Sequence, residues 1–216
     1  MDRRKALRNM GMAMGYTVAT PTLISLMQGC KTEPAMTWEP DFFTKDQGAA
    51  LLKLVDIVLP KTDTPSASEM QVHLFLDRFA AEAMEPKKRD FLKLTTEKFM
   101  QKALTESGSE TLADVDAEAL EKVFGGLLKI SKEDREANFE ALQKYEEGVA
   151  AEDSSVLLDD TVASFAFANT VRDMSIWGYK TSEYVGEEVL AYLPIPGEYV
   201  GCGDVQELTG GKAWSL

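Results

Sequence analysis

Apolar residues recur every three or four positions from Thr44 onward, and this spacing constrains the fold more than any other feature of the chain. Thr44 and Gln47 form a predicted capping box, and Pro60 ends the apolar run that follows it. Further helices are predicted where the same spacing returns, within 69–83, from Pro86 to about Ala103, and over 120–127, 131–149 and 156–177. Because no long alternating run favours a strand, the predicted class is all-α, a single irregular helical domain.

Two of these helices carry specific expectations. Ser131 is the predicted N-cap of the helix over 131–149, with Leu142, Tyr145 and Val149 facing inward. The segment 156–177 is the most apolar part of the domain, and its apolar residues cover more than one face. A helix of that kind is usually surrounded by others, so we expect it to be central and the most buried.

Regular structure is predicted to end near residue 192. Ser182 is the expected N-cap of a last helix that runs to about Tyr192. Beyond it, prolines and glycines recur at positions 194, 196, 197, 201, 203, 210 and 211. These residues interrupt helices and strands, so an extended Pro/Gly-rich tail is predicted over 193–216. No internal repeat or second domain is evident.

The first thirty residues have the layout of an export signal, with a basic start and a moderately apolar stretch. Arg3 and Arg4, followed by Leu7, are typical of a twin-arginine signal. The alternative is an ordinary basic start that happens to contain two arginines. Either interpretation sends the protein out of the cytoplasm, so the bacterial cell envelope, in particular the periplasm, is the expected location.

Cys30 follows Gly29 at the end of this segment, as in the lipobox of a bacterial lipoprotein. An acylated cysteine anchors a protein to a bilayer without a spanning helix. The alternatives are a plain signal peptidase site or an uncleaved membrane anchor. The predicted organisation is a twin-arginine-type lipoprotein signal over 1–30, a tether over 31–43 and a helical domain over 44–216.

The chain is acidic, with a formal net charge of −13. Since the first thirty residues carry +3, the remainder carries −16. Such a chain repels nucleic acid and offers no basic stripe, which argues against DNA or RNA as a partner. The acidity serves solubility or, alternatively, complements a basic redox partner.

Residues able to perform chemistry are scarce. His73 is the only histidine, too few for the usual metal sites and, without a nucleophile motif, for a catalytic triad. Adjacent carboxylates such as Glu187 and Glu188 point about 100° apart on a helix and make poor catalytic pairs. A disulfide between Cys30 and Cys202 is formally possible, but Cys202 is left as an odd thiol if Cys30 is acylated. We expect no catalytic, cofactor-binding or metal-binding residue in this chain.

Aromatic residues and prolines gather near the C-terminus. Such residues bury a large area at low entropic cost and are enriched at interfaces. The predicted partner interface consists of Trp177, Tyr179, Tyr184, Tyr192, Pro194, Pro196, Tyr199 and Trp214. The alternative is that this segment packs against its own domain.

Several motifs resemble those of the gluconate 2-dehydrogenase subunit 3 family. They are the twin-arginine start, Trp38-Glu39-Pro40 with Phe43-Thr44, Leu59–Pro65, Phe75–Arg78, Gly178–Glu183 and, the most specific, Tyr192–Cys202. Ser66 is a departure, since glycine is expected after Thr64-Pro65. The resemblance covers nearly the whole chain.

The resemblance implies a small subunit, without a cofactor of its own, in a membrane-associated sugar dehydrogenase complex. The implied partners are a FAD-containing flavoprotein of the glucose–methanol–choline type, which oxidises gluconate, an aldose or a glycoside, and a c-type cytochrome with haem c as electron acceptor. The small subunit then serves export and assembly of the flavin subunit. Two alternatives remain at this stage. The first is a free-standing envelope lipoprotein that binds glycan or protein through its aromatic tail, and the second is an enzyme in its own right.

Overall fold

The computed structural model describes residues 38–153, 155–195, 197 and 202–215. The predicted signal residues Arg3, Arg4 and Leu7 and the predicted lipidation site Cys30 lie outside this part, as do Pro196 and Tyr199. The chain divides into two compact units, 1–39 and 40–216, and every helix with described bounds belongs to the second. None of the described helices combines the length and hydropathy needed to cross a membrane.

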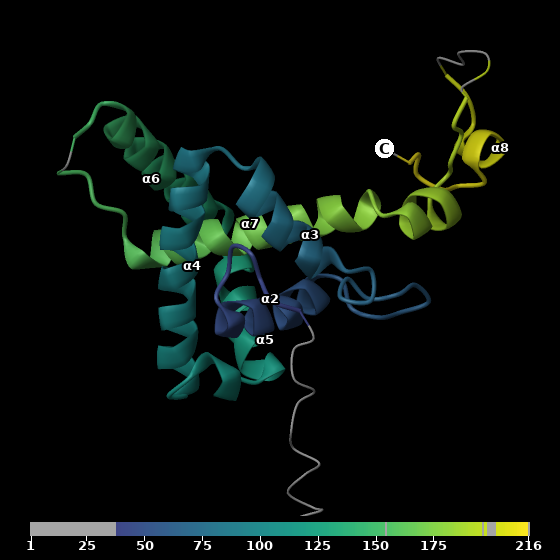
Figure 1. The fold of residues 1–216 in the computed structure, drawn as a ribbon. Coiled ribbons are helices and arrows are strands. Elements are labelled where there is room, and N and C mark those ends of the chain that lie inside the picture. Colours follow the sequence, from purple (N-terminus) through teal and green to yellow (C-terminus); the bar gives the residue numbers. More distant parts are fainter. Residues whose placement is uncertain (1–37, 154, 196, 198–201, 216) are drawn as a thin grey trace, which may run out of the picture. The chain divides into compact units, whose positions relative to one another are not determined.

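The described residues of the second unit are helical, without a β-strand, as the apolar spacing predicted (Figure 1). The main α-helices are α2 (Lys45–Val58), α3 (Val72–Arg78), α4 (Pro86–Ser107), α5 (Ala117–Leu128), α6 (Lys132–Ala150), α7 (Asp160–Lys180) and α8 (Val205–Thr209). Two π-helical turns, η2 (Phe79–Ala83) and η4 (Val185–Val189), and a 3₁₀ turn, η3 (Leu112–Asp114), complete the set.

The ends of the helices follow from local capping chemistry. The Thr44 hydroxyl accepts a hydrogen bond from Gln47 N–H (3.2 Å), and the Gln47 side chain accepts one from Thr44 N–H (3.0 Å), which confirms the capping box of α2. Ser131 caps α6 as predicted. Pro86 opens α4, and Gly108 ends it in the left-handed conformation (φ 69°) that glycine adopts without strain.

The predicted helix over 69–83 begins later than expected and changes register. Gln71 has a φ of 58°, a left-handed conformation that an α-helix excludes, so α3 starts at Val72. After Arg78 the backbone hydrogen bonds join residues five apart instead of four, which forms the π-helical turn η2. Apolar spacing alone does not report either feature, because it describes side chains and not backbone dihedrals.

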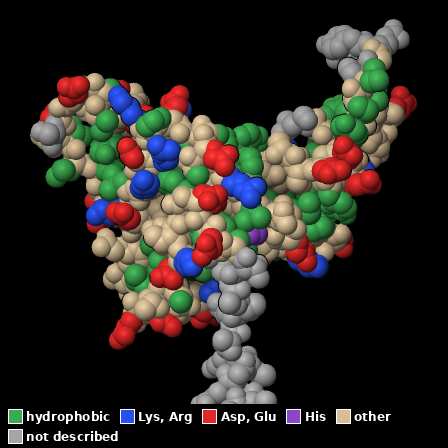
Figure 2. Space-filling view, viewed as in Figure 1, with side chains coloured by type: hydrophobic (Ala, Val, Ile, Leu, Met, Phe, Trp, Pro, Cys, Tyr) green, Lys and Arg blue, Asp and Glu red, His purple; other side chains and the backbone are tan. Residues whose placement is uncertain are grey.

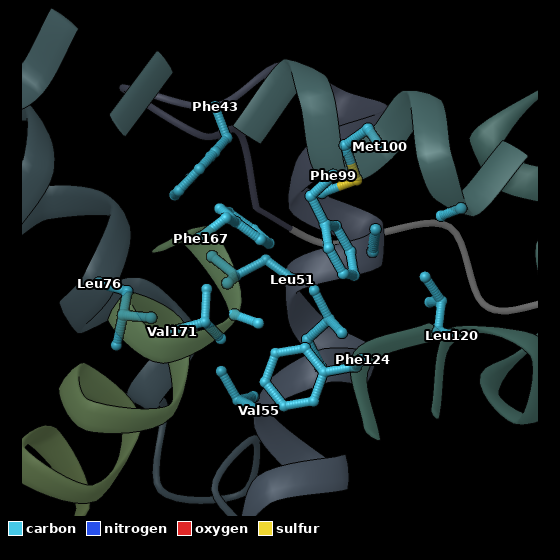
Figure 3. Packing of buried hydrophobic residues seen from close by; sticks show 14 of the residues in the cluster. Phe43, Leu51, Val55, Leu76, Phe99, Met100, Leu120, Phe124, Phe167 and Val171 are labelled. Carbon is cyan, nitrogen blue, oxygen red and sulfur yellow. The ribbon is translucent and has the colours of Figure 1, made fainter. Parts of the chain in front are cut away.

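Helix α7 is the central element, as predicted. It packs against α2, α3, α4, α5 and α6, and Figure 1 shows it crossing α4. Phe167, Ala168 and Val171 are buried in the core that α7 shares with these helices. In Figure 3 Phe99 and Phe167 lie side by side, with Leu51 close to them, and the two rings are 4.7 Å apart. Full burial of each such side chain contributes about 1.5–3 kcal/mol.

The prediction for α6 was wrong in part. No described residue of α6 is buried, Leu142 and Tyr145 are half-buried, and Val149 is 46% exposed. The helix packs on one side of α7 and touches it through the rings of Phe139 and Phe165, 5.2 Å apart. The Tyr145 ring also lies 5.9 Å from Phe91 of α4, and these contacts leave the predicted inward face only partly covered.

The C-terminal end also differs from expectation. The Ser182 hydroxyl donates to the Tyr179 carbonyl (2.7 Å) in the last turn of α7, and its side chain caps no new helix. The helical turns that follow extend only to Val189. The predicted irregular tail contains the short helix α8, which Asp204 caps by accepting hydrogen bonds from Gln206 and Glu207 N–H.

Candidate functional site

Segments far apart in the sequence meet at the C-terminal end of α7. The Tyr179 hydroxyl donates a hydrogen bond to the Pro65 carbonyl (2.7 Å) and contacts Thr64 Oγ1 (3.0 Å). These bonds join α7 to the loop between α2 and α3. Two motifs of the family resemblance, Leu59–Pro65 and Gly178–Glu183, therefore form one structural unit.

The third motif, Phe75–Arg78, lies against the same end of α7. A Cβ built on Gly178 would lie 2.5 Å from Phe75 Cδ1, so only glycine lets α3 approach α7 this closely. Trp177 makes edge-to-face contacts with Phe75 and Phe79, with ring centroids 5.0 and 5.3 Å away. Trp177 nevertheless remains 43% exposed, so this aromatic cluster presents an open apolar face.

The loop beside this cluster is held by its own polar contacts. The Asp56 carboxylate accepts hydrogen bonds from Ser68 N–H (2.7 Å) and Ser68 Oγ (2.6 Å). Hydrogen bonds from Lys61 and from Ser66 N–H lower the pKa of Glu69 from its ordinary value of 4.5. Ser66, which stands where the family resemblance leads to an expected glycine, has a negative φ that any residue adopts. Among the described non-glycine residues, only Gln71 and Glu152 have a positive φ.

Asp77 fixes the start of the domain to α3. Its side chain is buried, with 1% exposed, and accepts the backbone N–H groups of Asp41 (2.7 Å), Phe42 (3.0 Å) and Phe43 (3.1 Å). Three charge-assisted bonds compensate the loss of water around a buried carboxylate. They also place the buried ring of Phe43 in the core.

His73 is buried one turn before Asp77 on α3. Burial disfavours the imidazolium form and lowers its pKa from the ordinary value of 6.5, while the charges of Asp56 and Asp77 oppose that shift. Sequence analysis assigned His73 no catalytic role.

The chain beyond α7 forms a C-terminal arm, residues 183–215. Val185 is buried in the core, and Val189 and Leu190 pack against it, which fixes the root of the arm. Further along, Ala191 N–H donates to the Ala213 carbonyl (2.8 Å), and Ser215 N–H donates to the Ala191 carbonyl (2.9 Å). The end of the chain therefore folds back on the root of the arm.

Large apolar side chains of the arm remain exposed. Tyr192 and Trp214 are each 49% exposed. The other exposed members are Tyr184, Leu193, Ile195, Val205 and Leu208. Large exposed apolar patches are typical of surfaces that bind another molecule.

The arm is also acidic. Its described residues include five carboxylates, Glu183, Glu187, Glu188, Asp204 and Glu207, against the single lysine Lys212. Lys212 is engaged with the Glu188 carbonyl (3.2 Å). Figure 2 shows red and green side chains along the arm, whereas the blue ones lie mainly over the other helices.

The structure separates the predicted interface residues into two groups. Trp177, Tyr184, Tyr192, Pro194 and Trp214 are exposed. Tyr179 differs from them, because its ring is buried and its hydroxyl is bonded within the domain, so it holds the fold together. Sequence reasoning missed Leu193, Ile195, Val205 and Leu208. They could have been recognised as apolar residues in a Pro/Gly-rich segment, where no helical or alternating spacing places them on one buried face.

Nowhere in the described part of the chain do three or more His, Cys, Asp or Glu side chains come together as a metal site requires. Cys202 is exposed and has a free thiol. The side chains exposed at this end of the molecule are mainly aromatic rings, aliphatic chains and carboxylates.

The comparisons agree with the motifs. A family model described as Gluconate 2-dehydrogenase subunit 3 matches residues 45–197. The chain belongs to this family. The match begins with the first residue of α2 and reaches into the arm, so it includes the loop, α3 and the end of α7. As a subunit 3 family member, the chain has the place of an accessory subunit in a dehydrogenase complex. No curated protein and no solved structure matches it.

Proposed function

We propose that this chain is the non-catalytic small subunit of an exported, flavin-dependent sugar dehydrogenase complex, and that it serves export and assembly of the flavin subunit. The partner is a flavoprotein of the glucose–methanol–choline type that oxidises gluconate, an aldose or a glycoside. A c-type cytochrome accepts the electrons. The complex lies in the periplasm, held to a membrane through acylated Cys30.

The exposed, acidic and aromatic arm is the observation that carries this proposal. Its root is held in the core through Val185, while Tyr192 and Trp214 remain open to a partner. Large aromatic side chains on a rigid root are frequent binding hot spots, because little conformational entropy is lost when they are covered. Acidic neighbours favour a partner whose facing surface is basic.

The export role rests on the paired Arg3 and Arg4 ahead of a soft apolar stretch. Twin-arginine signals belong to proteins that are exported already folded. A flavin subunit that acquires FAD in the cytoplasm and has no signal of its own could therefore cross the membrane bound to this chain. In this proposal the arm binds the flavin subunit, and the N-terminal segment is the export signal.

The test is co-expression of this chain with its flavin subunit, followed by measurement of flavoprotein in the periplasm. Arg3→Lys together with Arg4→Lys should abolish its periplasmic accumulation while the complex still forms in the cytoplasm. Arg8→Lys is the matched control, because it keeps the arginine pair. Full export of the flavoprotein with the double variant would refute the escort role. Purification from native membranes as a monomer free of flavoprotein would instead indicate a free-standing envelope lipoprotein.

A further inference from the structure

Two shallow hollows adjoin each other where the arm leaves α7. The first has a volume of about 470 Å³ and the second about 480 Å³. Met70 and Ser182 line both, so the hollows form one continuous groove. The groove begins over α3 and η2 and ends over the root of the arm.

The first hollow is mainly apolar. Leu74, Phe75 and Phe79 line it and are each half-buried. The ring centroids of Phe75 and Phe79 lie 5.9 Å apart. Gly178 also lines this hollow and contributes no side chain to it. An aromatic or branched aliphatic side chain that enters this hollow would cover apolar surface that water now contacts.

The second hollow is acidic. Glu183, Glu187 and Glu188 line it together with Tyr184. The lining of the first hollow includes one carboxylate, Glu82, and one cation, Arg78. Among the described residues, no lysine or arginine forms an ion pair with any of these four glutamates. The groove therefore combines an apolar recess with neighbouring carboxylates that outnumber the two nearby cations, Arg78 and Lys212.

The walls of the groove are held in place by contacts described above. The close approach of Gly178 to Phe75 fixes α3 against α7, and the Tyr179 hydroxyl fixes the loop that leads to Met70. The π-helical turn η2 sets the position of Phe79, and π-helical turns are frequent at functional sites. A groove that is already formed requires little ordering when it binds a ligand.

We propose that this groove binds an extended segment of the flavin subunit in which an aromatic or aliphatic anchor is followed by lysines or arginines. The anchor occupies the hollow at Phe75 and Phe79, and the basic residues lie over Glu183, Glu187 and Glu188. This inference rests on the proposed function and adds the chemistry of the partner segment and its direction along the groove.

A photo-cross-linker tests the occupant directly. p-Benzoylphenylalanine replaces Met70, which both hollows share, in the complex of the full chain with its flavin subunit. Mass spectrometry should locate the cross-link on a flavin-subunit segment with an apolar residue and at least two neighbouring lysines or arginines. The same cross-linker at the exposed Glu140 of α6 is the control and should give no such product.

Removal of the glutamate charges tests whether the acidic hollow contributes to binding. The triple variant E183Q/E187Q/E188Q should weaken the complex about tenfold and reduce its sensitivity to salt. The matched variant E133Q/E140Q/E146Q removes the same charge from exposed positions of α6 and should change the affinity little. Equal weakening by both triples would overturn the groove proposal, because only the overall charge would then matter.

The remaining outcomes separate the two proposals. If the flavin subunit co-purifies but the cross-link at Met70 is absent, falls on an acidic segment or joins this chain to itself, the groove proposal fails and the proposed function stands. If wild-type chain does not associate with the flavin subunit, the proposed function fails.

Discussion

Gly178 presents its bare α-carbon to the ring of Phe75, and a Cβ placed there would lie 2.5 Å from Cδ1 of that ring. Phe75 cannot retreat freely, because its ring also contacts Phe79 and Trp177. One residue type at one position thus sets the distance between α3 and α7, and with it the width of the aromatic end of the molecule.

Gly178→Ala should therefore destabilise the domain, although alanine favours helix. Overpacking of this kind typically lowers the free energy of unfolding by about 1–3 kcal/mol, and urea denaturation measures it. Gly126→Ala on α5 is the control, since no heavy atom lies within 4 Å of a Cβ built there. That variant should gain stability by about 0.5–1 kcal/mol. Equal stability of Gly178→Ala and wild type would contradict the close packing.

Asp77→Asn should loosen the start of the domain from α3. The amide keeps the shape of the carboxylate, but one of its two ends becomes a donor that faces backbone N–H groups. Leaving a buried donor unsatisfied costs about 1–3 kcal/mol. A lower midpoint of thermal unfolding is the expected result, and Asp63→Asn at an exposed loop position should leave the midpoint unchanged.

Tyr179→Phe should weaken the contact between α7 and the loop that contains Pro65. The substitution removes the hydroxyl that donates to the Pro65 carbonyl, which costs about 1 kcal/mol. Tyr184→Phe removes an exposed hydroxyl and serves as the control in chemical denaturation. The interpretation fails if the two variants have the same free energy of unfolding.

The burial of His73 predicts a loss of stability in acid. Its pKa in the folded protein lies below the ordinary value of 6.5, so the unfolded chain binds more protons between the two values. The contribution of neutral His73 is complete above about pH 6.5 and is lost as the pH falls toward the folded pKa. His73→Gln should flatten the decline in unfolding free energy between about pH 7 and about pH 5. An unchanged slope in that interval would show that other groups cause the decline.

Trp214→Ala should weaken binding of the flavin subunit while the domain stays folded. Trp214 is 49% exposed, and removal of a hot-spot aromatic costs about 2 kcal/mol or more in binding. Leu157 is 87% exposed and lies outside the arm, so Leu157→Ala is the control for loss of an exposed apolar side chain. Titration of the flavin subunit against each variant measures the dissociation constant. Similar constants for the two variants would remove Trp214 from the interface.

The sequence by itself determined the helical class, the capping box of α2, the Ser131 cap of α6 and the burial of α7. These features depend on residues within one or two turns of each other, or on apolar spacing along one helix, and both are visible in a linear chain. The exposure of Tyr192 and Trp214 has a similar origin, because aromatic residues in a Pro/Gly-rich segment have no regular face to bury.

Only the tertiary structure decided which of those aromatic residues serve the fold. Tyr179 and Trp177 are two positions apart on α7, yet one ring is buried and the other is 43% exposed. The difference depends on Pro65, which is 114 positions from Tyr179 and receives its hydroxyl. Likewise Val149 is exposed because α6 lies on one side of α7 with little beyond it. Burial is a property of what packs on the opposite side, and local sequence carries no information about that neighbour.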